Sequence, residues 1–168
     1  MKRYLLILIG LFFIAAANGQ TDRAKVYVFV AEDCPVSIYM TTTLKSISTQ
    51  YVATADFYLV FPLPNSTAKT STAFKEQYSL SDYTCIVDKK QNLSKKLGAA
   101  ITPEVIVTNH ADSILYKGRI NDAYLETGKR RHIFSSNDLA DALALVADNK
   151  TVPQPWRPAI GCYITYKK

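Results

Sequence analysis

The sequence is poor in the residue types on which special-purpose scaffolds depend: its 168 residues include only three cysteines and two histidines. Three cysteines allow at most one intramolecular disulfide, which excludes a fold held together by several disulfides and leaves at least one thiol over. The two histidines, His110 and His132, have no partner at metal-ligand spacing, so we expect no metal site. We expect no cofactor either.

The chain also lacks internal repeats, low-complexity segments and any sign of a second domain. Acidic residues are outnumbered by basic ones, and the formal net charge is +6. The positive charge is spread along the chain, with one cluster from Lys129 to His132. This pattern favours weak contact with acidic surfaces and leaves peripheral membrane association open, but it does not resemble a nucleic-acid-binding tract. We therefore expect no nucleic-acid partner.

The first nineteen residues have the layout of a secretory signal peptide. A short positive start is followed by an apolar run from Tyr4 to Ala17, and small residues then suit cleavage before Gln20. The run is short for a membrane span. We expect residues 1–19 to be a signal peptide and residues 20–168 to form a single domain. The mature protein is then exported, either to the periplasm or out of the cell; a retained membrane anchor is the alternative.

The rest of the chain alternates between apolar runs and helical patterns, which predicts the order β-α-β-α-β-α-β-β-α. Alternating strands and helices favour a largely parallel central sheet, and a closing hairpin adds an antiparallel edge. The predicted fold class is α/β, with a central mixed sheet flanked by helices. We expect strands at 25–30, 56–61, 83–87, 104–108 and 113–120, helices at 35–51, 72–78 and 92–98, a last helix capped by Ser136 or Asn137, a polar loop at 65–69 and an irregular segment at 121–134.

Cys34 lies between the first expected strand and the first expected helix, and Pro35 suits the first turn of that helix. Unpaired backbone N–H groups and the positive end of the helix dipole favour the thiolate at this position and lower the pKa of the cysteine. The neighbouring carboxylates of Glu32 and Asp33 act in the opposite direction. On these residues alone, a reactive cysteine and an inert one both remain open.

Three features in this order resemble the thioredoxin superfamily: a strand, Cys34-Pro-Val-Ser37 at a helix start, and Thr102-Pro103 before a β-hairpin. The resemblance implies that Thr102 lies beside Cys34 and that the bond to Pro103 is cis. The 69 positions from Cys34 to Pro103 leave room for an extra helix and strand, as in the redoxin branch of alkyl hydroperoxide reductase and thiol-specific antioxidant proteins. The segments at 33–37, 102–104, 116–122 and 161–164 are similar to those of exported bacterial redoxin-like proteins.

Two features of these relatives are missing. Ser37 stands where a dithiol thioredoxin has its second cysteine, so the usual rapid resolution of a mixed disulfide is unavailable. Peroxiredoxins carry a threonine that helps to hold the peroxide, and Ala31 stands at that position here, with Tyr27 at the position of their proline. The site therefore lacks the threonine hydroxyl on which ordinary peroxiredoxin catalysis depends.

The other cysteines are candidate partners of Cys34. Cys85 falls in an expected strand and reads as an inert core cysteine. Cys162 lies in a proline-rich tail, and Gly161 gives it backbone freedom to fold back. We therefore entertain two hypotheses for Cys162: a partner that resolves Cys34, or part of a packed terminal strand without a redox role. Arg119, at a strand end, is expected to pair with Asp122 or Asp112.

Three functions are compatible with these residues. The first is a thiol–disulfide oxidoreductase outside the cytoplasm, in which Cys34 attacks a disulfide or an oxidant and Cys162 or an external thiol resolves the product. Ser37 would hydrogen-bond the sulfur, and Thr102, before Pro103, would help to dock an extended partner. The second is a thiol peroxidase that forms a sulfenic acid on Cys34. The third is a non-enzymatic binding module. The expected partners are protein thiols or disulfides, or a small oxidant.

Overall fold

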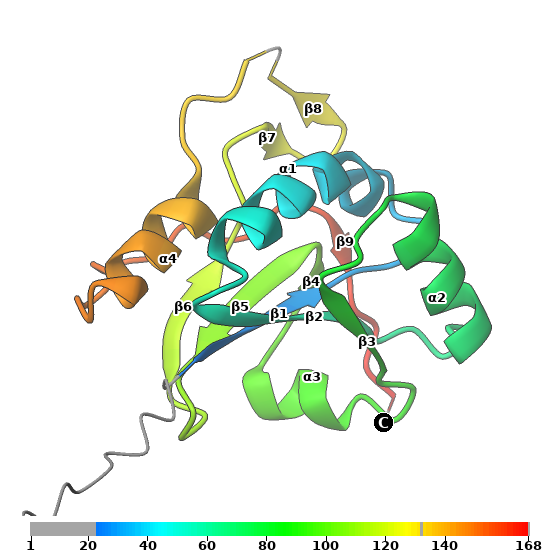
Figure 1. Ribbon diagram of the computed structural model, residues 1–168. Helices are drawn as coiled ribbons and strands as arrows, with labels where there is room; N and C mark the ends of the chain where they lie inside the picture. Colours follow the sequence, from blue (N-terminus) through cyan, green and yellow to red (C-terminus); the bar gives the residue numbers. More distant parts are fainter. Residues whose placement is uncertain (1–22, 132, 168) are drawn as a thin grey trace, which may run out of the picture.

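The computed structural model, which describes residues 23–131 and 133–167, has a five-stranded mixed sheet at its centre (Figure 1). The strand order is β3-β2-β1-β5-β6. β1, β2 and β3 are parallel, whereas β5 runs antiparallel to both β1 and β6, so the sheet is less parallel than expected. The expected signal peptide and His132 lie outside the described residues. The strands are β1 (Ala24–Phe29), β2 (Ala55–Phe61), β3 (Tyr83–Val87), β5 (Glu104–Thr108) and β6 (Ile114–Gly118).

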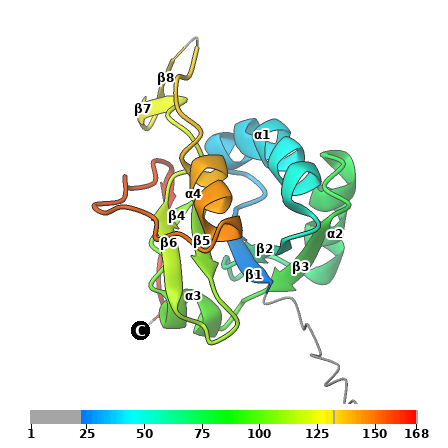
Figure 2. The ribbon, with the colours of Figure 1, turned by 60° about the vertical axis from the view of Figure 1, so that its left-hand side comes forward.

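Helices cover both faces of this sheet (Figures 1 and 2). α1, α2 and α4 pack on one face, where Leu44, Phe74 and Leu139 join the main hydrophobic core. The opposite face is covered by α3 and the C-terminal tail, through Leu97 and Ile164. No helix among the described residues is both long and apolar enough to cross a membrane. The helices are α1 (Pro35–Tyr51), α2 (Ala68–Gln77), α3 (Asn92–Leu97) and α4 (Asp138–Ala147).

Strand β1 shows how the sequence pattern places the two faces. Val26 and Val28 are fully buried in the main core, because alternate side chains of a strand point to the same face. Tyr27 points to the opposite face and stacks on Tyr58 of β2, with ring centroids 5.1 Å apart. The two tyrosines are register partners in the parallel pairing, which is where cross-strand side chains meet.

Two short strand pairs lie outside the main sheet. A terminal strand at Cys162 was one of the two hypotheses for that residue, whereas its pairing partner and the second pair were not predicted. β4 (Ile101–Thr102) pairs antiparallel with β9 (Cys162–Tyr163), which joins the end of the chain to the segment before Pro103. β7 (Tyr124–Glu126) and β8 (Lys129–Arg130) form a hairpin within the stretch expected to be irregular. The hairpin projects above α1 and α4 in Figure 1.

Helix α2 begins earlier than expected, within the segment assigned to a polar loop. Thr67 and Thr70 form a capping box: the Thr67 hydroxyl accepts from the N–H of Thr70 at 3.1 Å, and the Thr70 hydroxyl accepts from the N–H of Thr67 at 2.9 Å. The usual box has glutamate or glutamine at the second position, so a threonine there gave no clear signal. At α4 the N-cap is Asn137, whose side chain makes no capping hydrogen bond.

Arg119 does not pair with either expected carboxylate. Its guanidinium binds Asp138 at 2.9 Å and donates to the hydroxyl of Ser136 at 3.1 Å, because the start of α4 packs over the end of β6. Asp112 instead binds Lys25 and Lys96. The expected pairings were wrong because they were drawn from neighbours along the sequence and not from the packing of α4.

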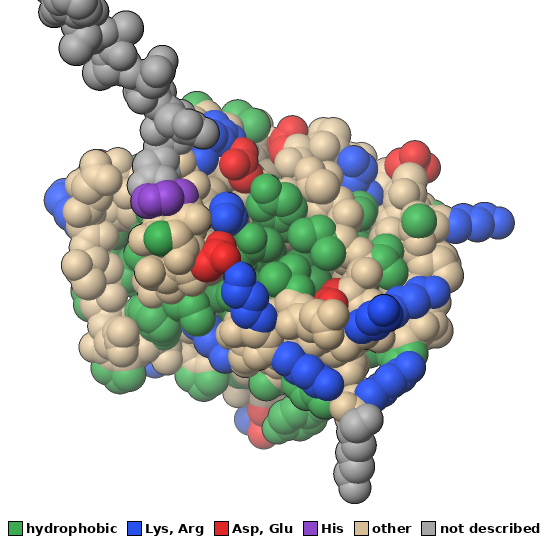
Figure 3. Space-filling model, turned by 90° about the horizontal axis from the view of Figure 1, so that it is seen from below, with side chains coloured by type: hydrophobic (Ala, Val, Ile, Leu, Met, Phe, Trp, Pro, Cys, Tyr) green, Lys and Arg blue, Asp and Glu red, His purple; other side chains and the backbone are tan. Residues whose placement is uncertain are grey.

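Part of the positive charge of the sequence lies on the face that carries α3. Figure 3 shows lysine and arginine side chains clustered around this part of the surface, beside an apolar area. The exposed lysines of this region are Lys89, Lys90, Lys95, Lys96 and Lys167.

Asp122 anchors the segment that carries the β7–β8 hairpin. Its carboxylate accepts from the backbone N–H groups of Ser135 and Ser136, at 2.7 and 3.0 Å, and from the Ser135 hydroxyl at 2.9 Å. The hydrogen bond from Ser136, followed by those from Ser135, lowers the pKa of Asp122 to about 2, although burial acts the other way. The two ends of the hairpin segment are thereby tied together.

Replacing Asp122 with alanine is expected to reduce the free energy of unfolding at pH 7. The folded-state pKa lies below the ordinary value of 3.8. The carboxylate therefore stabilises the protein fully above that value, and this contribution is lost as the pH falls towards 2. Urea unfolding of the wild type and Asp122→Ala at pH 7 and pH 2.5 measures the difference, with the exposed Asp141→Ala as the matched control. A difference that is the same at both pH values would contradict the assignment.

Candidate functional site

Cys34 is the N-cap residue of α1, directly after the turn that follows β1. Its backbone is extended, with φ −80° and ψ 115°, and Pro35 occupies the first helical position, where no N–H is needed. The backbone carbonyl of Cys34 accepts from Ile38 at 3.0 Å, which starts the helix. The side chain is only 2% exposed and packs with Ala31 and Val36. The sulfur therefore sits at the N-terminus of α1, largely out of water.

Thr102 lies beside Cys34, and the Thr102–Pro103 peptide bond is cis, as the resemblance implies. In its thiol form, Cys34 donates to the carbonyl oxygen of Thr102, with Sγ and O 3.2 Å apart. Thr102 is itself buried and belongs to β4. The segment before Pro103 thus lies directly against the sulfur of Cys34.

Cys162 brings a second sulfur to the same place. The Sγ atoms of Cys34 and Cys162 are 2.7 Å apart, although the residues are 128 positions apart in the chain. Both cysteines are free thiols in this structure. A disulfide bond is about 2.05 Å long, so a small side-chain movement would bring the two sulfurs to bonding distance. Cys162 is held there by the strand pairing, in which it is the register partner of Thr102.

The two thiols differ in acidity. Burial is the largest influence on the pKa of Cys34 and raises it, but hydrogen bonds from the Cys162 thiol and from Ser37 outweigh burial and leave the pKa below the ordinary value. Burial raises the pKa of Cys162, and the negative charge of Cys34 and then of Asp33 raises it further. The shared proton therefore stays on Cys162, and Cys34 is the better nucleophile.

Ser37 is fully buried in the first turn of α1, and its backbone N–H and its hydroxyl both point to the site. Its backbone N–H and its hydroxyl each hydrogen-bond the sulfur of Cys34 and lower the pKa of that thiol. The hydroxyl oxygen accepts in turn from the backbone N–H of Ala31 at 3.3 Å. Ser37 therefore fixes the turn before the helix as well as the sulfur.

The two acidic neighbours of Cys34 differ in their surroundings. The carboxylate of Glu32 accepts from the hydroxyls of Ser66 and Thr70, both at 2.8 Å, at the start of α2. Asp33 is exposed, and its charge is felt at Cys162. The expected opposition to a Cys34 thiolate is reduced for Glu32, because its charge is shared with two hydroxyl donors.

The β7–β8 hairpin lies over the start of α1 and contacts the tail. Tyr124 packs edge-on against Tyr39 of α1, with ring centroids 5.6 Å apart, and the guanidinium of Arg130 lies 4.7 Å from the Tyr39 ring. The hydroxyl of Thr127 donates to the carbonyl of Gly161 at 3.2 Å, directly before Cys162. This hairpin was not predicted from the sequence, and the signal that indicates it is the glycine at position 128, whose φ is 86°.

Cys85 is remote from this pair. It lies in the edge strand β3, is half-buried, and donates to the carbonyl of Ser71 at 3.6 Å. Burial raises the pKa of the Cys85 thiol, which keeps it protonated and weakly nucleophilic. It is less buried than a core cysteine, because β3 has a neighbouring strand on one side only.

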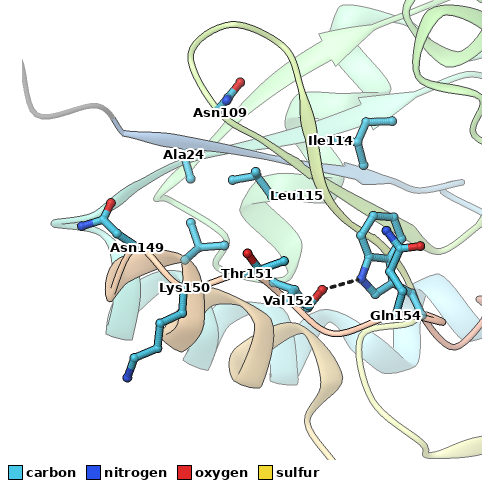
Figure 4. Close-up of a pocket in the computed structure, with 11 residues that line it drawn as sticks. Ala24, Asn109, Ile114, Leu115, Asn149, Lys150, Thr151, Val152 and Gln154 are labelled. Atoms are coloured by element: carbon cyan, nitrogen blue, oxygen red, sulfur yellow. Dashed lines mark hydrogen bonds between the residues drawn. The ribbon is translucent and has the colours of Figure 1, made fainter.

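A separate hollow of about 390 Å³ lies at the opposite end of β1, between the β5–β6 turn and the segment after α4 (Figure 4). Its lining includes Lys150 and Asn149, and the Val152 carbonyl at its wall accepts from the indole N–H of Trp156. The lining holds no cysteine, histidine or carboxylate, so it offers no thiol and none of these side chains as a general base. Across residues 23–131 and 133–167, no group of three or more such side chains is placed to hold a metal ion.

Comparisons with known proteins place the fold. No protein-family model and no curated protein matches the sequence. An uncharacterized conserved protein from Geobacillus kaustophilus has a similar structure, with TM-score 0.76, 21% identity, and coverage of 87% of this chain and 78% of that chain. A hypothetical protein from Sinorhizobium meliloti 1021 gives TM-score 0.75, 23% identity, and coverage of 88% and 81%.

A third similar structure is that of a secreted Mycobacterium tuberculosis disulfide oxidoreductase homologous to E. coli DsbE. Its TM-score is 0.53 at 13% identity, with 73% of this chain and 81% of that chain covered. Likenesses at these identities establish the architecture and not the activity. The chain has an α/β thioredoxin-like fold, with a mixed central sheet flanked by helices.

Proposed function

We propose that this protein is a thiol–disulfide oxidoreductase in which Cys34 is the nucleophile and Cys162 is the resolving cysteine. The observation that carries the proposal is the 2.7 Å contact between the two sulfurs. The opposite pKa shifts of the two thiols assign the roles, because the thiolate is the attacking species in disulfide exchange. Ser37 supports the thiolate by hydrogen bonds, and Thr102 holds the strand that carries Cys162 in place.

The reaction is a two-electron exchange between this pair and a disulfide. The Cys34 thiolate attacks one sulfur of the disulfide, that S–S bond breaks, and a mixed disulfide forms while the first thiolate leaves. Cys162 then attacks Sγ of Cys34, its proton passes to the second leaving thiolate, and the Cys34–Cys162 bond forms. The substrate disulfide is reduced to two thiols as the protein dithiol is oxidised; with an oxidised protein and a substrate dithiol, the same steps run in reverse.

The proposal includes that the protein is exported and acts outside the cytoplasm. The N-terminal pattern of a signal peptide supports export, and disulfide chemistry is sustained in oxidising compartments. A relationship to the redoxin branch is supported by the Cys34-Pro35 helix start and by α2 and β3, which fill the interval before Pro103. Peroxidase chemistry has less support, because Ala31 has no hydroxyl to hold a peroxide and a second thiol occupies the space beside Cys34.

Mild oxidation is expected to join Cys34 to Cys162 and to leave Cys85 free. The bond would close a loop spanning 128 positions, and in the chain-entropy model this raises the free energy of unfolding by about 5 kcal/mol. Peptide mass mapping after thiol blocking identifies the pair, and urea unfolding of oxidised and reduced protein measures the stability gain. Cys85→Ser is the control and should behave like the wild type. A disulfide that involves Cys85, or none, contradicts the proposal.

Cys162→Ala is expected to raise the pKa of Cys34, because the hydrogen bond from the Cys162 thiol is lost while burial still acts on the sulfur. The rate of alkylation by iodoacetamide, followed against pH, reports the thiolate of Cys34. The midpoint of the profile should move to higher pH in Cys162→Ala and stay in place in Cys85→Ala. A binding module without redox chemistry would show no shift and an ordinary cysteine pKa.

Gly161→Ala is expected to separate the two sulfurs without touching either. A Cβ at this position would lie 2.1 Å from the carbonyl oxygen of Thr102, too close for β9 to keep its place on β4. A displacement of about 1 Å can lower a reaction rate by about a hundredfold, so intramolecular disulfide formation should slow by that order. Alkylation of Cys34 should persist. Unchanged oxidation kinetics would show that the β4–β9 pairing does not position Cys162.

A further inference from the structure

The edge of β4 beside Cys34 is occupied by the protein's own C-terminal strand. Ile101 pairs with Tyr163, and Thr102 pairs with Cys162. The N–H of Ile164 donates to the carbonyl of Ala100 at 2.9 Å, which extends the pairing by one residue. An extended polypeptide that binds by adding a strand needs these same backbone groups. While β9 is in place, these backbone groups are already hydrogen-bonded and cannot bind such a partner.

The tail is fixed firmly after Cys162 by a buried amide. Gln91 is fully buried, and its side-chain N–H group donates to the carbonyls of Pro62 at 3.2 Å and Thr165 at 2.9 Å. Its carbonyl oxygen accepts from the backbone N–H of Lys167 at 2.9 Å. Gln91 therefore ties the loop after β2 to two residues of the tail. Breaking these bonds inside the protein is costly, since buried polar groups would be left unpaired.

Apolar contacts hold the same segment. Ile164 is 6% exposed and packs with Phe29 and Leu97 beneath the sheet, and the hydroxyl of Tyr166 donates to the carbonyl of Ala99. Burial of an isoleucine side chain stabilises by about 1.5–3 kcal/mol. The strand that carries Cys162 is thus held from both sides of the cysteine, since Gly161 is fixed by Thr127.

The two cysteines differ in exposure, because Cys34 is only 2% exposed and its sulfur contacts that of Cys162. Cys162 is half-buried, and Tyr163 next to it is 81% exposed. A compact disulfide needs only a side-chain movement of Cys162 to meet Cys34. An extended chain needs β9 to leave β4, which costs the Gln91 hydrogen bonds and the burial of Ile164.

We propose that the C-terminal strand makes this site selective for low-molecular-weight disulfides over cysteine-bearing extended polypeptides, with Gln91 as the positioning residue that keeps the strand in place. The inference rests on the proposed exchange between Cys34 and Cys162 and specifies its substrate. A small disulfide R–S–S–R is cleaved by Cys34, one R–SH leaves, and Cys162 displaces the second R–SH as the Cys34–Cys162 bond forms. β9 stays on β4 through both steps.

The test compares two probes with the same leaving group on the reduced full-length mature protein. One probe is bis(2-hydroxyethyl) disulfide. The other is an uncharged extended peptide whose central cysteine carries the same 2-hydroxyethylthio group. Stopped-flow rates of Cys34 oxidation are measured for the wild type, for Gln91→Met, which keeps side-chain length but loses the amide, and for the exposed Gln77→Met as the matched control. Hydrogen exchange at the amides of Ile164 and Lys167 reports whether the tail is released.

The wild type and Gln77→Met should react faster with the small disulfide than with the peptide. In Gln91→Met, the two tail amides should exchange faster. The rate with the peptide should rise by about tenfold, which is the factor that corresponds to losing one or two net hydrogen bonds. The rate with the small disulfide should change little. Ile164→Ala removes the apolar anchor and should act in the same direction if Gln91→Met folds poorly.

The outcomes separate the two proposals. If the wild type reacts with neither probe, the exchange between Cys34 and Cys162 is wrong, and the inference about its substrate falls with it. If the wild type reacts equally fast with both probes, or if the ratio of the two rates is unchanged in both tail variants, the exchange stands and the selectivity is overturned. A purely structural role for Gln91 would lower both rates together.

Discussion

The antiparallel pairing of β9 with β4 is the interaction on which the candidate site depends. It places Thr102 opposite Cys162 and so carries a thiol from near the end of the chain to the N-terminus of α1. The pairing is tight, because Gly161 approaches the Thr102 carbonyl where no side chain would fit. Downstream, the buried amide of Gln91 and the side chain of Ile164 hold the tail against the sheet. A pairing of two residues is not stable by itself, and these contacts keep β9 in register with β4.

The chemistry of the pair follows from its position. At the start of α1, Cys34 accepts hydrogen bonds from Ser37 and Val36, and these, with the bond from Cys162, outweigh the burial that would raise its pKa. Cys162 has no helix N-terminus, so burial and the neighbouring negative charge both act to keep its proton. Ser37, at the position of the second cysteine of a dithiol thioredoxin, therefore hydrogen-bonds the Cys34 sulfur, while the tail brings a second thiol beside it. The same tail occupies the edge of β4 beside the two cysteines.

Local sequence patterns predicted the parts that depend on local physics. The buried run of β1, the helix start at Cys34-Pro35 and the end of α3 next to Gly98 were placed to within a residue, because apolar periodicity, proline and glycine act over a few positions. The start of α2 was missed because its capping box uses two threonines. The β7–β8 hairpin was missed because its pattern is polar, and its place is set by Asp122 and by contacts with Tyr39.

By itself, the sequence determined the α/β fold class, the position of Cys34 at a strand-to-helix turn, and the absence of a second cysteine one turn away. Those features are settled by residues adjacent in the chain. Only the tertiary structure placed Cys162: the residue lies in a packed terminal strand, and that strand holds its sulfur 2.7 Å from Cys34. A contact across 128 positions depends on the fold of everything between, and on Gln91, whose sequence neighbours give no sign of it.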